Sequence, residues 1–121
     1  MAFPFENLDV YKRSIEFNTA IASILERKGI TRTLTDQLSR AALSIPLNIA
    51  EGNGRWHKGD KRQFFWIARG SVFECVPLIE ILTIKKILTT EENETFREQL
   101  EVLGKMLTKL AQINEVDNST V

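Results

Sequence analysis

The amino-acid sequence predicts an all-α fold, an antiparallel up-and-down four-helix bundle that forms a single domain over residues 1–121. Apolar residues recur at helical spacing in four segments of the chain. No segment alternates apolar and polar residues in the way of a half-buried strand, and the connections between the four segments are short. A length of 121 residues with 43% hydrophobic content suits one compact domain. The polar residues 117–121 should form a short frayed tail.

The first helix is expected over about residues 8–28. Its apolar residues form two adjacent stripes, which together are wider than one partner helix would need. Gly29 follows Arg27 and Lys28 and is a suitable stop, because glycine adopts the left-handed conformation easily and positive charge favours the carboxyl end of a helix. The preceding Phe-Pro-Phe of residues 3–5 should be an extended lead-in whose rings dock on the bundle.

The second helix is expected to begin near Thr33. A threonine can cap a helix start, and Asp36 three residues later makes a weaker version of the capping box. The helix should end near Gly52 or Gly54, since both glycines can take a positive φ at little cost. The connection over residues 52–60 is then a polar turn.

A proline lies inside this second helix without ending its periodicity. Pro46 falls just beside a stripe of apolar or small residues at four-and-three spacing: Leu38, Ala42, Ile45, Ile49 and Gly52. Proline removes one backbone donor and pushes its ring toward the carbonyl four residues earlier, here that of Ala42. The helix should therefore bend at Pro46 and continue, provided that packing holds both halves.

The third helix, expected over about residues 60–84, is apolar almost all the way round. Its apolar residues are Phe64, Phe65, Trp66, Ile67, Val72, Phe73, Val76, Leu78, Ile79, Ile81 and Leu82. A helix of a four-helix monomer normally keeps one polar face. Two interpretations stay open: this helix is the central one of the bundle, or another subunit covers its outer face. Pro77 should kink it.

The fourth helix begins at Thr89, which is expected to form a capping box with Glu92 three residues later. Acidic residues in the first turn also complement the positive end of the helix dipole. One apolar stripe follows, made of Phe96, Leu100, Leu103, Leu107 and Leu110. This pattern is typical of a bundle helix with one buried face.

Basic and acidic residues balance over the whole chain but not along it. Sixteen Lys and Arg residues against sixteen Asp and Glu residues give a formal net charge of zero, so the bulk charge favours neither nucleic acid nor a membrane as a partner. Residues 27–69 hold nine basic and three acidic side chains, whereas residues 70–121 hold five and nine. The chain therefore has a basic middle and an acidic end.

The sequence indicates a cytoplasmic protein. Cys75 is the only cysteine, so no internal disulfide can form, and its apolar neighbours predict a small core side chain. No pattern of a signal peptide is visible, and charged residues interrupt the longest apolar stretch, in residues 64–84. We expect a reducing compartment and no membrane partner.

Catalytic motifs are missing from the sequence, which therefore predicts a protein that is not an enzyme. It has one histidine, no His, Cys, Asp and Glu set at metal-ligand spacing and no Walker lysine, so neither a metal nor a cofactor is expected. The Gly-Asn-Gly of residues 52–54 is half a phosphate fingerprint but follows a helix, which favours a helix stop. Asn48 is expected to hydrogen-bond the bent backbone of the second helix. Glu51 is expected to pair with Arg40 or Arg55.

The turn between the second and third helices is the candidate functional site. It holds four cations within eight residues and an interleaved tryptophan: Arg55, Trp56, Lys58, Lys61 and Arg62. Arg40 and Arg69 are expected to approach it from the neighbouring helices. Lysine and arginine neutralise phosphates and an exposed tryptophan stacks on an unpaired base, so the turn predicts a site for a nucleic-acid backbone. The alternative is a solvated helix start with Trp56 packed on the bundle.

The centre of the chain also resembles a known family. Residues 43–55, preceded by residues 37–42 and followed by the Ile-Ala-Arg-Gly-Ser of residues 67–71, are similar to the signature of the four-helix-bundle proteins encoded in intervening sequences of bacterial 23S rRNA genes. The likeness extends over about residues 5–113. The positions of the motif are Pro46, Asn48, Glu51, Gly52 and Gly54. A similar pattern occurs in the accessory variability determinants of diversity-generating retroelements.

The resemblance implies a four-helix subunit, assembly with copies of itself into a homopentameric barrel, and a role in binding RNA or DNA. It also leaves a second function open. The protein would then be an interaction scaffold for another protein, such as the reverse transcriptase that the retroelement relatives suggest. A hydrolase or nuclease is a third class, which the missing catalytic motifs disfavour.

Overall fold

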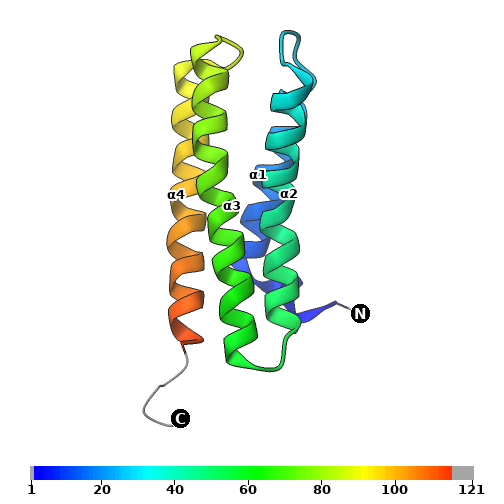
Figure 1. Cartoon of the computed structure of the whole chain (residues 1–121), viewed down its shortest axis with the longest axis vertical. Helices are drawn as coiled ribbons and strands as arrows, with labels where there is room; N and C mark the ends of the chain where they lie inside the picture. Colours follow the sequence, from blue (N-terminus) through cyan, green and yellow to red (C-terminus); the bar gives the residue numbers. More distant parts are fainter. Residues whose placement is uncertain (1, 116–121) are drawn as a thin grey trace.

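Four helices lie side by side and run in alternating directions (Figure 1). The computed structural model describes residues 2–115, so the tail expected over residues 117–121 lies outside the described residues. The helices are α1 (Asp9–Ile24), α2 (Arg32–Gly54), α3 (Lys58–Ile84) and α4 (Thr90–Ile113), after a short 3₁₀ turn, η1 (Pro4–Asn7). Residues 2–115 contain no strand, and the prediction of an all-α fold with four helices is confirmed.

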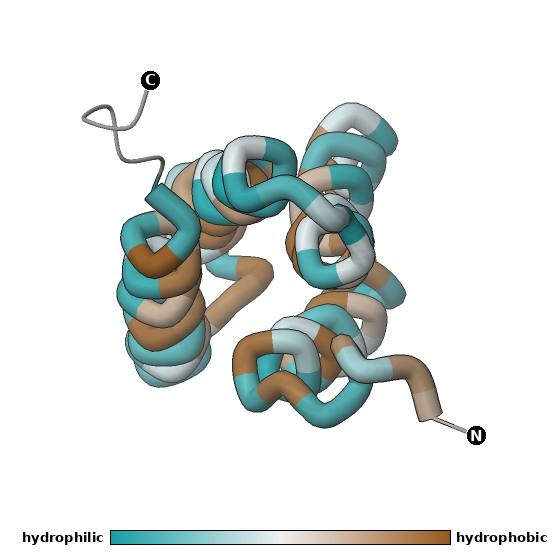
Figure 2. The backbone as a smooth tube through the Cα atoms, turned by 90° about the horizontal axis from the view of Figure 1, so that it is seen from below, coloured by the Kyte–Doolittle hydropathy of each residue, from teal (hydrophilic) through white to brown (hydrophobic). Residues whose placement is uncertain are grey.

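The four helices surround a common core, as the view along the bundle shows (Figure 2). α3 packs between α2 and α4, and α1 closes the bundle against the same two helices. Each helix contributes fully buried side chains to this core, among them Phe17, Ile45, Ile79 and Leu107. Phe17 meets Phe96 of α4 edge-on, with ring centroids 5.9 Å apart and ring planes at 89°. The buried faces of α2 and α4 are those that the helical spacing of apolar residues predicts, whereas the wide apolar surface of α1 is only partly buried and leaves Ile15 41% exposed.

Two helices start at the same end of the bundle, each with a threonine cap. The hydroxyl of Thr89 accepts a hydrogen bond from the Glu92 amide at 3.1 Å, and the Glu92 carboxylate accepts one from the Thr89 amide at 2.9 Å. The predicted capping box of α4 is therefore confirmed. The cap of α2 is Thr31, whose hydroxyl accepts from the Leu34 amide at 3.2 Å. The prediction that Thr33 caps this helix is wrong.

The amino-terminal part differs from its prediction in two places. The lead-in coils into the 3₁₀ turn Pro4–Asn7 and is not extended, although Phe5 does dock edge-on against Tyr11 with ring centroids 5.0 Å apart. α1 ends at Ile24, four residues before the predicted end. Gly29 takes a φ of +93°, as expected of the residue that stops the chain from continuing as a helix.

The two glycines at the end of α2 are helical. α2 continues to Gly54 and α3 begins at Lys58, so the turn holds only residues 55–57. Neither Gly52 nor Gly54 uses the positive φ expected of a stop. Gly52 is required by packing instead, because a Cβ there would lie 2.9 Å from Cε1 of Phe65 in α3. The close approach of α2 and α3 at this point depends on the missing side chain.

Pro46 is buried inside α2, and the helix continues through it as predicted. The carbonyl of Ala42, which has lost its helical donor, accepts a hydrogen bond from Nδ2 of Asn18 in α1 at 2.7 Å. The same amide group also donates to the Ser14 carbonyl at 2.9 Å. Because Ala42 is fully buried, this bond from α1 satisfies a carbonyl that water cannot reach.

α3 has one face in the core and an apolar stripe on its opposite side. The core face consists of Phe65, Ala68, Val72, Cys75, Ile79 and Leu82. The outer stripe, as we call it, is exposed from Trp66 to the end of the helix and consists of Trp66, Gly70, Phe73, Pro77, Ile81 and Ile84. The interpretation of α3 as an enclosed central helix is therefore wrong. The helix is continuous through Pro77.

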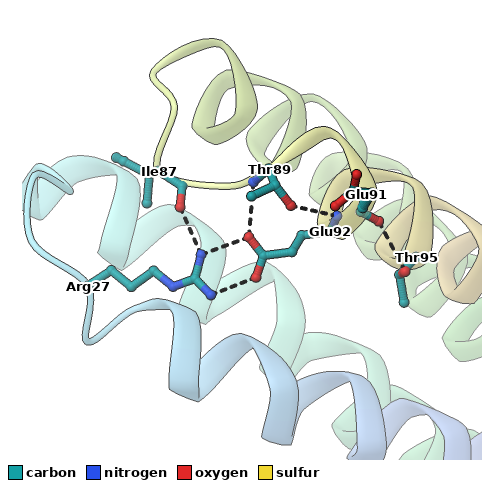
Figure 3. A network of polar contacts seen from close by, with 6 residues as sticks. All are labelled: Arg27, Ile87, Thr89, Glu91, Glu92 and Thr95. Carbon is teal, nitrogen blue, oxygen red and sulfur yellow. Dashed lines mark hydrogen bonds and ion pairs between the residues drawn. The ribbon is translucent and has the colours of Figure 1, made fainter.

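An ion pair fixes the end of the bundle that carries the α1–α2 and α3–α4 connections (Figure 3). Arg27 binds the Glu92 carboxylate with both of its terminal nitrogens, at 2.6 and 2.9 Å, and donates to the Ile87 carbonyl at 2.8 Å. The hydrogen bond from Arg27, aided by that from the Thr89 amide, lowers the pKa of Glu92 to about 2. The connection after α1 is thereby tied to the start of α4. We call this end, with residues 25–31 and 85–89, the loop end.

Candidate nucleic-acid interface

The candidate site lies at the opposite end of the bundle, where residues 55–57 join α2 to α3 (Figure 1). We call this end the turn end. The indole of Trp56 is 90% exposed, so the alternative in which it packs on the bundle is wrong. An indole in water presents both of its faces to a stacking partner. Trp56 is therefore a large apolar side chain of the turn that has most of its surface in water.

Lys61 is committed to holding the turn together. Its ammonium group donates to the carbonyl of Asn53 at 2.8 Å and approaches that of Gly52 at 3.5 Å. These carbonyls belong to the last turn of α2, where no helical donor is left for them. Lys61 thus caps α2 from the first turn of α3. This role could not be predicted from the sequence, because the lysine and the carbonyls that it caps belong to different helices.

Arg55 is partly neutralised at the turn. Its guanidinium lies 3.2 Å from the Glu51 carboxylate, which confirms one of the two pairings predicted for Glu51. The same guanidinium lies 4.7 Å from the centroid of the Phe64 ring. Its side chain is still about half exposed, at 48%. Part of the charge of Arg55 is therefore balanced by Glu51, and less of it is available to a ligand than the sequence alone suggests.

Lys58 and Arg62 supply positive charge that is less neutralised than that of Arg55. Lys58 is the first residue of α3 and is exposed, and Arg62 follows one turn later, half-buried beside Trp66 in a shallow hollow. His57 precedes α3 as its cap residue but makes no side-chain hydrogen bond to the helix. The first amides of α3 are therefore left without a capping side chain, at the end of the helix whose dipole attracts anions.

Arg40 and Arg69 do not join the turn. Arg40 lies in α2, about 22 Å along the helix from Arg55 at 1.5 Å per residue. Its guanidinium is 3.9 Å from the Glu74 carboxylate of α3. Arg69 lies in α3, about 10 Å along the helix beyond Arg62. The two arginines belong to the sides of the bundle, so the expected approach from both helices is not found.

Arg69 contacts α4 and two aromatic rings of its own helix. Its Nε donates to Oγ1 of Thr108 at 2.8 Å. Its guanidinium carbon lies 4.3 Å from the centroid of the Phe73 ring and 5.1 Å from that of Trp66. Arg69 therefore holds two rings of the outer stripe in place through cation–π contacts.

Asn48 bonds to Ser44 within α2, and Ser44 in turn bonds to α3. Its Nδ2 donates to the carbonyl and to the hydroxyl of Ser44, at 2.8 and 2.9 Å, as the expected bond to the helix backbone requires. The hydroxyl of Ser71 in α3 lies 2.7 Å from that of Ser44. Asn48 and Gly52, both members of the sequence motif, therefore serve the contact between α2 and α3.

Cys75 is a core side chain, as predicted. It is fully buried, and this burial, with a smaller contribution from Glu74, raises the pKa of its thiol to about 12. The thiol stays protonated and unreactive at neutral pH. Over residues 2–115, no three His, Cys, Asp or Glu side chains are placed to share a metal ion. None of the described helices is long and apolar enough to cross a membrane.

Comparison with known proteins places the chain in a family. The family model of the 23S rRNA-intervening sequence proteins matches residues 6–109. No curated protein matches the chain. A crystal structure of a protein with unknown function from the S23 ribosomal protein family of Bacteroides thetaiotaomicron has the same fold, with a TM-score of 0.77 and 23% sequence identity over 84% of this chain and 97% of that one. Since the matched residues span most of its length, the chain belongs to the family of 23S rRNA-intervening sequence proteins.

Proposed function

We propose that this chain is a non-enzymatic protein that assembles with copies of itself and binds the backbone of RNA or DNA through the α2–α3 turn. The observation that carries the proposal is Trp56, 90% exposed between α2 and the uncapped start of α3. Lys58 and Arg62 flank it with charge that no carboxylate pairs within residues 2–115. Such a site can neutralise phosphates and stack an unpaired base.

The balance of charge at the turn also supports the proposal. Over residues 51–62 the chain has four basic and two acidic side chains, and one acidic residue, Glu51, is occupied by Arg55. The other is Asp60, exposed in the first turn of α3. The positive end of the α3 dipole adds to the local attraction for anions. A single turn of this kind would bind weakly, because it offers few phosphate contacts.

Assembly would make up for this weakness. The outer stripe of α3 exposes Phe73 by 52% and Ile84 by 73%, which is apolar surface that a lone subunit leaves in water. We propose that a second copy covers it, and the five-subunit barrel implied by the family resemblance is the specific form of this proposal. Repetition by symmetry would then present several turns to one polyanion and raise the avidity.

Oligomerisation is tested by light scattering at micromolar concentration. We expect a mass that is a multiple of the 13.8 kDa chain. Changing Phe73 to Glu should shift the mass to that of a single chain, because a carboxylate in the covered stripe would be buried without a partner. The matched control is Val102→Glu, at an exposed apolar position of α4 outside the stripe. A wild-type mass of one chain would refute the proposal.

The nucleic-acid site is tested by gel shift with a single-stranded RNA of 30 nucleotides. Trp56→Ala should weaken binding by about tenfold through the lost stacking, and Lys58→Glu with Arg62→Glu should remove the salt-sensitive component. Lys61 stays unchanged in this design because it caps α2. Arg97→Glu with Lys105→Glu, two exposed cations of α4, is the charge-matched control. Equal binding by the turn variant and the control would rule out the turn as the site.

A protein scaffold is the second candidate function, and the outer stripe is the feature that favours it. The same apolar surface could be covered by a different protein, such as a reverse transcriptase, in place of another copy. The test is a pull-down from a preparation whose absorbance ratio shows that it is free of nucleic acid. A stoichiometric complex with such a partner, disrupted by Phe73→Glu, would favour this function over the first.

A further inference from the structure

The loop end holds a second group of cations, from two connections far apart in the sequence. Arg27 donates to the carbonyl of Ile87 at 2.8 Å, which brings the α1–α2 and α3–α4 connections together (Figure 3). A hollow of about 520 Å³ lies there, lined by Arg27, Lys28, Gly29, Lys85, Lys86 and Ile87. Four of these six residues are cationic and none is acidic. The charge of this hollow is therefore unbalanced by its own lining.

Most of that charge is free. The guanidinium of Arg27 is occupied by the Glu92 carboxylate, which it binds with two nitrogens. Lys28, Lys85 and Lys86 are exposed, and no carboxylate of residues 2–115 lies within ion-pair distance of them. Three lysines without a carboxylate partner at one end of the bundle attract anions.

The backbone of Lys86 closes the end of α3. Lys86 has a φ of +63°, and it is the residue other than glycine for which a positive φ is found in residues 2–115. Its amide donates to the Thr83 carbonyl and the Ile87 amide donates to the Leu82 carbonyl, both at 3.0 Å, which is the hydrogen-bond pattern of a helix end that usually places glycine at this position. A side chain in this conformation is strained, whereas glycine is not. The positive φ therefore belongs to the C-cap of α3, which fixes the position of Lys86 beside Lys85 at the loop end.

We propose that Lys28, Lys85 and Lys86 form a second binding site for phosphodiester groups, at the opposite end of the bundle from the α2–α3 turn. The proposal takes nucleic acid as the ligand from the proposed function but does not depend on the turn. α3 alone spans about 40 Å, so the two sites contact different stretches of a nucleic acid. Together they would hold one strand at two places or join two strands.

The test is the salt dependence of binding to a fluorescein-labelled single-stranded RNA of 30 nucleotides, followed by anisotropy. In the variant Lys28→Gln, Lys85→Gln, Lys86→Gly, the slope of log K against log salt should fall by about 2, at about 0.7 for each lost phosphate contact. Between 50 and 200 mM salt, the wild type should therefore lose about 20-fold more affinity than the variant. The control variant Arg97→Gln, Lys105→Gln, Lys109→Gln removes three exposed cations of α4 and should leave the slope unchanged.

Lys86→Gly separates binding from folding. Glycine suits the left-handed backbone better than lysine, so the Tm of this variant should be unchanged or higher. The slope should nevertheless fall by about 0.7. A lower Tm together with an unchanged slope would mean that Lys86 serves the fold alone, and it would overturn the proposal.

The two proposed sites can be refuted separately. If the slope of the loop-end triple variant equals that of the wild type while Lys58→Glu with Arg62→Glu loses binding, the second site is refuted and the turn stands. If the loop-end variant loses slope and the turn variant does not, the second site stands and the turn is refuted. Unchanged RNA binding with lost binding to phosphatidylserine vesicles would show that the lysines meet a membrane surface, which also overturns the proposal.

Discussion

α2 and α3 each carry a glycine and a proline within a continuous helix, and the two pairs differ in their surroundings. In α2, Gly52 and Pro46 are both buried against neighbouring helices. In α3, Gly70 and Pro77 are both exposed on the outer stripe. A Cβ added at Gly52 would be 2.9 Å from a ring of α3, whereas one added at Gly70 would meet nothing within 4 Å. Packing inside the subunit therefore explains the glycine and the proline of α2, whereas no packing inside the subunit explains those of α3.

The difference indicates that the outer face of α3 is shaped by something outside the single chain. Glycine and proline lower the stability of a helix interior, so a lone subunit would gain by losing them from an exposed face. A second copy changes this balance. Glycine lets another backbone come close, and a face without long polar side chains is one that a neighbouring helix can cover. This reasoning supports the proposed assembly through α3.

The largest effect is expected at the packed glycine. Gly52→Val would force α2 away from α3, because Phe65 is buried and its ring cannot move aside. We expect the free energy of unfolding, measured by urea denaturation, to fall by about 3 kcal/mol. Gly54→Val is the control, since a Cβ there meets nothing within 4 Å, and its change should stay below about 0.5 kcal/mol. Equal changes in both variants would show that the contact with Phe65 does not decide the position.

The next effect tests the partner of the buried proline. Asn18→Ala would leave the Ala42 carbonyl buried without a donor, and we expect a loss of about 2 kcal/mol. In a Pro46→Ala background the helical donor returns, so the same change should cost less than about 1 kcal/mol. A double-mutant cycle by chemical denaturation measures the difference. Additive losses would show that Asn18 stabilises the bundle by some other contact.

The sequence predicted what is local and missed what joins helices. The four helices follow from the spacing of apolar residues, and the capping box of Thr89 and Glu92 lies within four residues of chain. The bond from Asn18 to Ala42 crosses 24 residues, and the packing of Gly52 on Phe65 joins two helices. No spacing rule reports such pairs. Gly52 could be seen in the sequence, but the packing that requires it could not.

The candidate site shows the same limit. The cations of the turn could be counted in the sequence, yet Lys61 is used as a cap and Arg55 is paired with Glu51. Their availability depends on neighbours that only the fold provides. The loop-end lysines were missed because Lys85 and Lys86 lie in the acidic half of the chain. The up-and-down topology, which the sequence did predict, was the signal that places them near Lys28.

A smaller effect of opposite sign is expected at the exposed proline. Pro77→Ala would return a donor to α3 and remove the clash of the ring with the preceding turn, so the isolated subunit should gain about 1 kcal/mol. The gain is less than the full cost of a proline in a helix interior, because Pro77 is exposed and water can reach the freed backbone group. Thermal unfolding at low protein concentration measures it. A loss of stability would mean that the single subunit itself depends on the proline.

The smallest effect is expected at Gly70, where one substitution should stabilise the single subunit and weaken its association with a second copy. Gly70→Ala should stabilise a dissociated subunit by about 0.7 kcal/mol, since alanine favours the helix and its Cβ meets nothing within 4 Å. Association should nevertheless become weaker, because the Cβ occupies space that a close backbone from a second copy would need. Urea denaturation below the dissociation concentration and sedimentation above it separate the two effects. If Gly70→Ala stabilises the subunit and leaves association unchanged, no backbone approaches this point, and the second copy must be sought on another face.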